Sequence, residues 1–232
     1  KGWQYPKKQM NDKEITGNIN YLDVNVIPIG EYQKKGYTYV IESLKKDNPI
    51  LSEKREGIQY TLIDGAIQSL NFIYPSIELD NNESISYKSL YGKLGLSRIM
   101  KSNYSGNKDY EYNEEIFENY GRIFSPNEIN KYSCKLSNII NTIKNSSGIV
   151  IIYSQYIYGG CVPIALALEE LGLTRYGKNS LFKNKPIESV DATTMKKKSE
   201  MTGNKNKFKP AKYAMITGDN KFSPNNKKEL KA

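Results

Sequence analysis

Two short groups of polar and aromatic side chains have the residue types that contact nucleic acid. Each group follows an apolar run, the first at positions 149–153 (IVIIY) and the second at 213–217 (YAMIT). Serine and glutamine can hydrogen-bond phosphate or sugar without carrying charge, tyrosine can stack on a base, and glycine lets a strand approach the backbone. The pattern therefore suits contact with a single nucleic-acid strand. The candidate nucleic-acid-binding residues are Ser154, Gln155, Tyr156, Gly218 and Asp219.

The same residues also have a purely structural interpretation. Ser154 and Gln155 would then cap a turn, while Tyr156 and Tyr158 would pack against the helix that follows. Polar loops carry function in many proteins, but every α/β fold also needs them as connections. The spacing alone leaves both interpretations open.

The composition excludes several kinds of catalytic chemistry. The chain has no histidine and two isolated cysteines, which rules out histidine-based zinc sites, a Ser-His-Asp triad and a Cys-His dyad within these residues. We expect both cysteines to be reduced thiols in a cytosol-like compartment. No GxxxxGK[ST] phosphate loop and no GxGxxG fingerprint is present. We therefore predict no catalytic or metal-binding residue in this stretch of sequence.

The elements that would position the candidate residues alternate between helix and strand. SPNE from Ser125 predicts a capped helix start, and apolar residues at spacings of three and four continue to position 143. The β-branched run 149–153 predicts a strand covered on both faces, as in a parallel sheet. A helix from Pro163 to Gly172 and a second strand at 213–217 complete the pattern. This order predicts an α/β layer with right-handed crossovers.

The first half of the chain gives weaker signals. We predict a strand at 23–29, a helix over 31–46 and short helices at 87–100 and 110–121, whereas the apolar stretch 69–75 has no clear assignment. No run is long enough to span a membrane. Since the chain starts at Lys1 without a signal peptide, we expect it to be an internal piece of a longer protein.

A long basic segment at 177–212 interrupts the second crossover. It holds ten lysines against three acidic residues, so it supplies +7 of the chain's net charge of +9. Segments of this length inside a compact unit are functional or disordered. Two interpretations stay open: a solvated flexible insertion, or a loop that contacts nucleic acid.

Three stretches of the second half resemble superfamily 2 helicases. They are YSCKLSNIINTIKNSSGIVIIYSQY, GGCVPIALALEELGLTRYG and AKYAMITGDNKFSPNN. The first resembles the entry to the second RecA-like lobe, with YSQY as its motif IV. The other two are similar to the helicase-like ATPases of nucleocytoplasmic large DNA viruses. That group includes the poxvirus nucleoside triphosphate phosphohydrolase I and the early-transcription-factor ATPase. The likeness is specific from about Ser125 to Asn226.

This resemblance implies a fold and a function. Residues 1–124 would be the end of the first lobe and a mostly helical interlobe segment. Residues 125–232 would begin an incomplete RecA-like lobe with a parallel sheet and the basic insertion 177–212. The full-length protein would be an ATP-dependent helicase or nucleoside triphosphatase that uses ATP and Mg²⁺ and acts on DNA or RNA.

By the same resemblance, the protein would serve viral transcription in the virion or the host cytoplasm, with viral RNA polymerase as a partner. The arginine-bearing motif VI would follow Ala232, so these residues alone would not hydrolyse ATP. We expect Arg98 and Arg122, at the ends of predicted helices, to lie on solvated surface. The alternative is a non-enzymatic module that binds RNA or a polymerase subunit through a degenerate RecA-like lobe.

Overall fold

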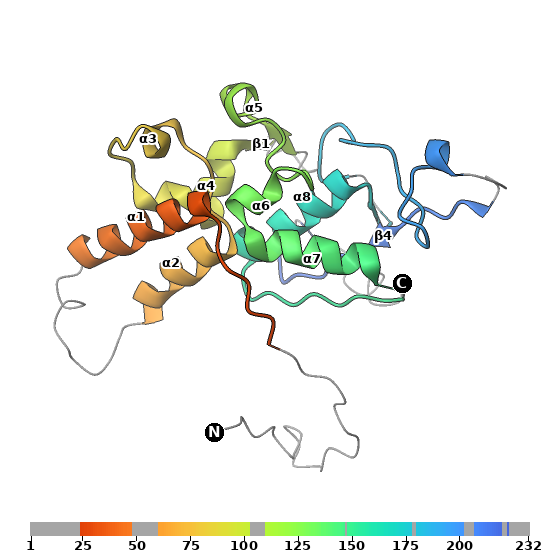
Figure 1. Cartoon of the computed structure of the whole chain (residues 1–232), viewed down its shortest axis with the longest axis horizontal. Coiled ribbons are helices and arrows are strands. Elements are labelled where there is room, and N and C mark those ends of the chain that lie inside the picture. The colour runs from red at the N-terminus through yellow and green to blue at the C-terminus, as the bar shows by residue number, and fades with distance from the viewer. Residues whose placement is uncertain are drawn as a thin grey trace, which may run out of the picture.

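The computed structural model describes residues 24–47, 60–102, 110–146, 148–177, 180–201, 207–219 and 222. About half of this part is helical, and it contains one antiparallel and one parallel two-stranded sheet. An α/β class is compatible with this content. Figure 1 shows the first helices at one end of the molecule and the 177–212 insertion at the other.

Helices α1 (Glu31–Asp47) and α2 (Tyr60–Asn71) pack against each other. The predicted helix over 31–46 is confirmed, and its apolar stripe buries Val40 and Leu44. By contrast, the predicted strand at 23–29 is wrong for its described part, because residues 24–29 carry no ladder. Pro28 lacks the N–H that a ladder requires.

The apolar stretch that the sequence left unassigned is a buried extended segment. Residues 72–76 follow α2 and are all buried. The Ile73 N–H donates to the Tyr132 carbonyl at 3.0 Å, and the Tyr74 N–H donates to the Leu90 carbonyl at 2.8 Å. These two bonds connect the segment to two different neighbours. They satisfy buried N–H groups that would otherwise lack a hydrogen-bond partner.

Short helices and a hairpin surround this segment. They are α3 (Ile77–Asp80), the 3₁₀ turn η2 (Tyr87–Leu90), α4 (Gly92–Ile99), β1 (Met100–Ser102), β2 (Tyr110–Tyr112) and α5 (Glu114–Tyr120). The predicted helices at 87–100 are confirmed as η2 and α4. The predicted helix at 110–121 is correct only from Glu114, because its first residues pair with β1 as an antiparallel strand.

The helix predicted from Ser125 begins later and in two pieces. Residues 125–128 form turns, followed by α6 (Ile129–Tyr132) and α7 (Cys134–Asn145). Ser133 separates the two helices and is the cap of α7, where its Oγ accepts from the Leu136 N–H at 3.0 Å. The predicted helix start at Ser125 is therefore wrong.

Both strands predicted for the second half are wrong over most of their length. Residues 149–153 form no ladder, and all five side chains are exposed. In Figure 1 this stretch runs back beneath α7 as a plain tube. Of 213–217, only Tyr213 belongs to a strand, since β4 (Lys212–Tyr213) pairs in parallel with β3 (Thr174–Arg175).

Helix α8 (Val162–Leu171) lies at the centre of the larger core. A π-helical turn, η3 (Ile157–Cys161), leads into it, Pro163 occupies its first turn, and Gly172 ends it with a φ of 103°. The start and end of this helix are confirmed. Its core neighbours include Phe72 and Phe222, so residues on both sides of position 124 share one core. Within the described ranges, every helix is too short or too polar to cross a bilayer.

The cap at Ser133 yields a stability prediction. Ser133 is fully buried, and its Oγ also donates to the Asn71 carbonyl at 2.6 Å. Ser133→Ala removes the cap and leaves this carbonyl without that donor, so we expect a loss of about 1–3 kcal/mol in the free energy of unfolding. Urea denaturation measures it. The control is Ser97→Ala, whose exposed hydroxyl bonds within its own helix. A change there of more than about 0.5 kcal/mol, or none at Ser133, would contradict the assignment.

Candidate nucleic-acid interface

The five predicted binding residues differ in exposure. Ser154 makes local bonds: its Oγ accepts from the Tyr156 N–H at 3.2 Å and lies 3.3 Å from the Tyr156 carbonyl. Ser154 therefore caps a turn, as the structural interpretation expected. Tyr156 is half-buried, whereas Gln155 and Gly218 are exposed. Of the first group, only Gln155 presents its side chain openly to solvent.

The two predicted loops meet through Tyr158. Its hydroxyl donates to Asp219 Oδ2 at 3.4 Å, and its ring meets the edge of Phe222 with centroids 5.7 Å apart. Lys93 from α4 places its ammonium 5.2 Å from the centroid of the same ring. Tyr158 packs against the larger core, as the structural interpretation expected, and it also contacts residues outside the following helix. Its contacts join the loop after 149–153 to the loop after β4.

We call this group the rim. It consists of Lys93, Tyr153, Gln155, Tyr158, Gly218 and Asp219. Tyr153 contributes an aromatic ring that is 89% exposed, directly before Ser154. Residue types predicted the two loops, but Lys93 comes from a helix 60 positions earlier, and no sequence signal connects it with them.

Helix α2 holds the turn that carries Tyr158. Asn71 Nδ2 donates to the Gly159 carbonyl at 3.3 Å, and Lys135 Nζ donates to Asn71 Oδ1 at 2.7 Å. A Cβ at Gly159 would lie 2.5 Å from Gln68 Oε1, so a larger residue there would displace the Gln68 side chain. The rim therefore rests on the α2 face at Gln68 and Asn71.

The end of α8 holds the basic insertion. Glu169 is buried, and its carboxylate accepts hydrogen bonds from the Leu181 N–H at 2.7 Å and the Phe182 N–H at 3.0 Å. The Ser180 hydroxyl and the Tyr213 hydroxyl donate to it as well. Four donors thus compensate the desolvation of one carboxylate.

The insertion is accordingly not solvated throughout. Leu181, Phe182 and Val190 are buried in the larger core, so the interpretation of 177–212 as a solvated flexible insertion is wrong for this part. Its lysines nonetheless point to water. The exposed ones in the described ranges are Lys183, Lys185, Lys196, Lys198, Lys207, Lys209 and Lys212.

Asp191 organises the outer part of the insertion. Oδ1 accepts from the Thr193 N–H at 3.0 Å and the Thr194 N–H at 2.9 Å, and Oδ2 accepts from the Lys209 N–H at 3.0 Å. These bonds, that from Lys209 foremost, lower the pKa of Asp191 below its ordinary value. The Asp191 carboxylate thus joins positions 191 and 209, together with a backbone bond from the Ala192 N–H to the Lys209 carbonyl at 2.7 Å.

The two arginines expected on solvated surface are engaged instead. Arg122 forms an ion pair with the buried Glu170, with Nε 3.2 Å from Oε1. Burial raises the pKa of Glu170, and the Arg122 guanidinium and the Tyr112 hydroxyl oppose this rise. Arg98 is half-buried and donates to the Pro75 carbonyl. Both arginines have a structural role, because each donates a hydrogen bond to an acceptor that folding buries.

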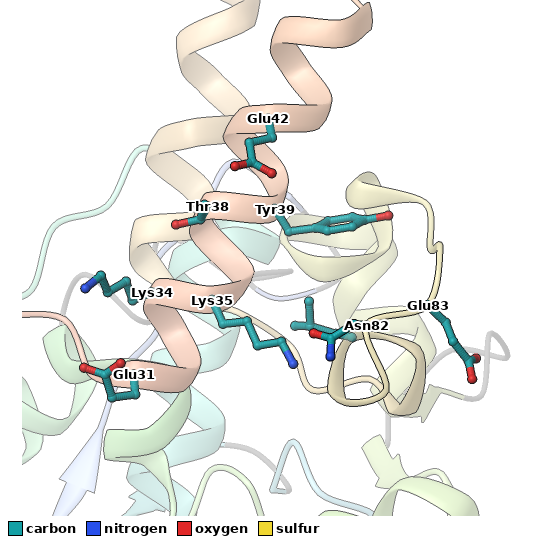
Figure 2. Close-up of a pocket in the computed structure, with 9 residues that line it drawn as sticks. Glu31, Lys34, Lys35, Thr38, Tyr39, Glu42, Asn82 and Glu83 are labelled. Atoms are coloured by element: carbon teal, nitrogen blue, oxygen red, sulfur yellow. The ribbon is translucent and has the colours of Figure 1, made fainter.

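A hollow of about 390 Å³ lies elsewhere, along α1 (Figure 2). Its lining residues are Glu31, Lys34, Lys35, Thr38, Tyr39, Glu42, Leu79, Asn82 and Glu83. The lining carries three carboxylates and two ammonium groups, and this net negative charge disfavours the binding of a polyanion. We therefore place the candidate interface at the rim and not in this hollow.

The described residues include no cluster of three or more cysteine, aspartate or glutamate side chains that could hold a metal ion. Cys134 and Cys161 are both free thiols, as expected. Burial raises the pKa of the Cys161 thiol, which disfavours the reactive thiolate. Neither thiol is placed for nucleophilic chemistry.

Comparisons with protein-family models, with curated proteins and with solved structures gave no match for this chain.

The bonds at Asp191 yield a prediction for the insertion. An asparagine presents an N–H₂ group to one of these amide donors, so Asp191→Asn should weaken the hydrogen bonds of these amides. We expect faster hydrogen exchange at the Thr193, Thr194 and Lys209 amides, with the core unchanged. In the native chain, the lowered pKa means that this contribution is present above the ordinary value of 3.8 and is lost as the pH falls through the folded value.

The matched control is Glu188→Gln, which removes the same charge from an exposed position of the same insertion. It should leave these three amides as protected as in the native chain. Equal protection in the Asp191→Asn variant would show that the carboxylate does not hold the loop.

Proposed function

We propose that the rim binds a single strand of nucleic acid. The observation that carries this proposal is the contact between Tyr158 and Asp219, because it brings the two loops into one surface. The exposed ring of Tyr153 can stack on a base, and Gln155 can hydrogen-bond a phosphate or a sugar. The Asp219 carboxylate can accept a hydrogen bond from a base amine or a 2′-hydroxyl.

Electrostatic attraction comes from two sources. Lys93 provides an ammonium group at the rim itself. The exposed lysines of the 177–212 insertion provide a larger positive surface, and each phosphate that they neutralise releases a counterion. Affinity should therefore be modest and should fall steeply with salt.

We further propose that this surface serves an ATP-dependent helicase or translocase in viral transcription. The support is the resemblance of residues 125–226 to superfamily 2 enzymes, together with the contact between Tyr158 and Asp219 that joins the two loops. ATP and Mg²⁺ would bind residues outside these 232, since this sequence contains no phosphate loop. On this proposal DNA or RNA and a viral RNA polymerase are partners, in the virion or the host cytoplasm.

The alternative is a non-enzymatic module that binds RNA or a polymerase subunit. It is favoured by the lack of a strand ladder at 149–153, which a RecA-like sheet would require. The full reading frame distinguishes the two proposals. A phosphate loop before Lys1 and an arginine-rich motif after Ala232 would support the motor, and the lack of both would support the module.

The insertion lysines yield a salt-dependence prediction. Lys196 and Lys198 are exposed in the same short loop. If both contact phosphates, the Lys196→Gln/Lys198→Gln variant should reduce the slope of log K against log salt by about 1.4 for a single strand. Fluorescence anisotropy with a labelled oligonucleotide at several salt concentrations measures this slope.

The matched control is Lys45→Gln/Lys46→Gln. It removes the same charge from the last turn of α1, at the opposite end of the molecule (Figure 1). The slope of this variant should stay close to the native value. Equal effects of the two variants would show that net charge, and not the insertion, drives binding.

The exposed tyrosine yields a prediction about stacking. Tyr153→Ala should weaken binding of a single strand by about 1–3 kcal/mol, because base–aromatic stacking contributes that much, while the salt slope stays unchanged. Anisotropy titration at a fixed salt concentration measures the affinity. Phe117→Ala is the control, since it removes a half-exposed aromatic ring from α5, away from the rim. An unchanged affinity of the Tyr153→Ala variant would exclude stacking at this position.

A further inference from the structure

The extended segment 211–219 has one buried side and one exposed side. Ala211, Tyr213 and Met215 are buried in the larger core. Every second residue between and after them is exposed, namely Lys212, Ala214, Ile216 and Gly218. Successive side chains of an extended chain point to opposite sides, so a period of two is the expected pattern. The exposed residues therefore form one row along the protein surface, and this row ends at the rim.

Strand β3 adds a tyrosine to the row. In the parallel pair, Thr174 lies opposite Lys212 and Arg175 lies opposite Tyr213. The Tyr176 N–H donates to the Tyr213 carbonyl at 2.8 Å, which continues this contact past the end of β3. Since Arg175 is buried between them, Thr174 and Tyr176 point to the exposed side. The Tyr176 ring is 39% exposed, and the Lys212 ammonium lies 5.9 Å from its centroid.

We call this surface the β4 face. It consists of Thr174, Tyr176, Lys212, Ala214, Ile216 and Gly218. One end of the β4 face is basic. Lys185 of the insertion donates to the Ser189 hydroxyl, which lies 3.2 Å from Thr174 Oγ1. Because Thr174 is the neighbour of Lys212 across the sheet, two exposed lysines are held at this end, opposite to the rim.

We propose that the β4 face is a second base-stacking subsite for a single nucleic-acid strand, with Tyr176 as its stacking ring. This proposal rests on the proposed function of the rim, from which the strand would continue. An exposed aromatic ring beside lysines is the combination that binds single strands with little sequence preference. The charged residues at this end are lysines, which complement phosphates. Ala214 and Gly218 are small, so a nucleic-acid chain can lie close to the protein backbone.

The length of the β4 face sets the length of the strand that it holds. Six residue steps separate Lys212 from Gly218. At ~3.3 Å per residue, these steps span about 20 Å. This distance corresponds to about six nucleotides at the ~3.4 Å spacing of stacked bases. An oligonucleotide of about ten nucleotides is therefore long enough to cover the β4 face and the rim together.

Fluorescence anisotropy with such an oligonucleotide, of a single base type, tests the proposal on the 232-residue chain. Tyr176→Ala should weaken binding about fivefold or more, because a stacked base contributes ~1–3 kcal/mol. Tyr176→Phe keeps the ring and should bind as tightly as the native chain. Circular dichroism checks that both variants are folded. Equal binding by the native chain and the Tyr176→Ala variant would overturn the proposal.

The Tyr153→Ala variant separates this proposal from that of the rim. If Tyr153→Ala weakens binding and Tyr176→Ala does not, the rim binds nucleic acid and the β4 face does not. A native chain without affinity for the oligonucleotide would overturn both proposals. A native chain that binds poly-glutamate as tightly as the oligonucleotide would have an acidic protein as its partner, which also overturns the β4 face as a stacking subsite.

Photocrosslinking of the native chain provides a readout that needs no variant. Under irradiation, 5-iodouracil in the oligonucleotide bonds to aromatic side chains that stack on it. Peptide mapping should then find an adduct on Tyr176. Phe117 is the matched control, because it is 50% exposed but lies in α5. The lack of an adduct on Tyr176, or equal labelling of Tyr176 and Phe117, would contradict stacking at the β4 face.

Discussion

The described structure depends on the burial of two adjacent carboxylates at the end of α8. An isolated carboxylate in an apolar interior is costly, so each must be met by several donors. Glu170 accepts hydrogen bonds from Arg122 and Tyr112, which belong to residues 1–124. Glu169 accepts hydrogen bonds from the Leu181 N–H of the insertion and from the Tyr213 hydroxyl. These two neighbouring glutamates therefore connect residues 1–124 and the 177–212 insertion to the same helix, α8.

This arrangement explains why the rim and the insertion are part of one body. Helix α8 follows directly from η3, the turn that carries Tyr158, and its other end holds residues 180–182. The aromatic contact with Phe222 and the bond to Asp219 then position the last described loop. Lysines on the insertion are consequently presented by a packed loop, so the entropy lost on the proposed contact with nucleic acid would be smaller than for a disordered tail.

The sequence predicted elements whose signals are local and missed those that depend on distant partners. The spacing of apolar residues was sufficient to predict α1. The proline at the start and the glycine at the end were sufficient to predict α8. Ser133, and not Ser125, is the helix cap. Its hydroxyl also donates a hydrogen bond to the Asn71 carbonyl at the end of α2. The run 149–153 has every local property of a strand, yet a strand needs a neighbour, which no single run encodes. At the proposed rim, residue types predicted Gln155 and Asp219, whereas only the fold places Lys93 beside Tyr158.

Gly172 takes part both in the end of α8 and in the path of the loop at residues 188–190. It ends α8 in a left-handed conformation, and a Cβ there would lie 2.9 Å from the Glu188 carbonyl oxygen. The same residue accepts the Val190 N–H on its own carbonyl. Any substitution of Gly172 would therefore alter the helix terminus and the return path of the neighbouring loop together.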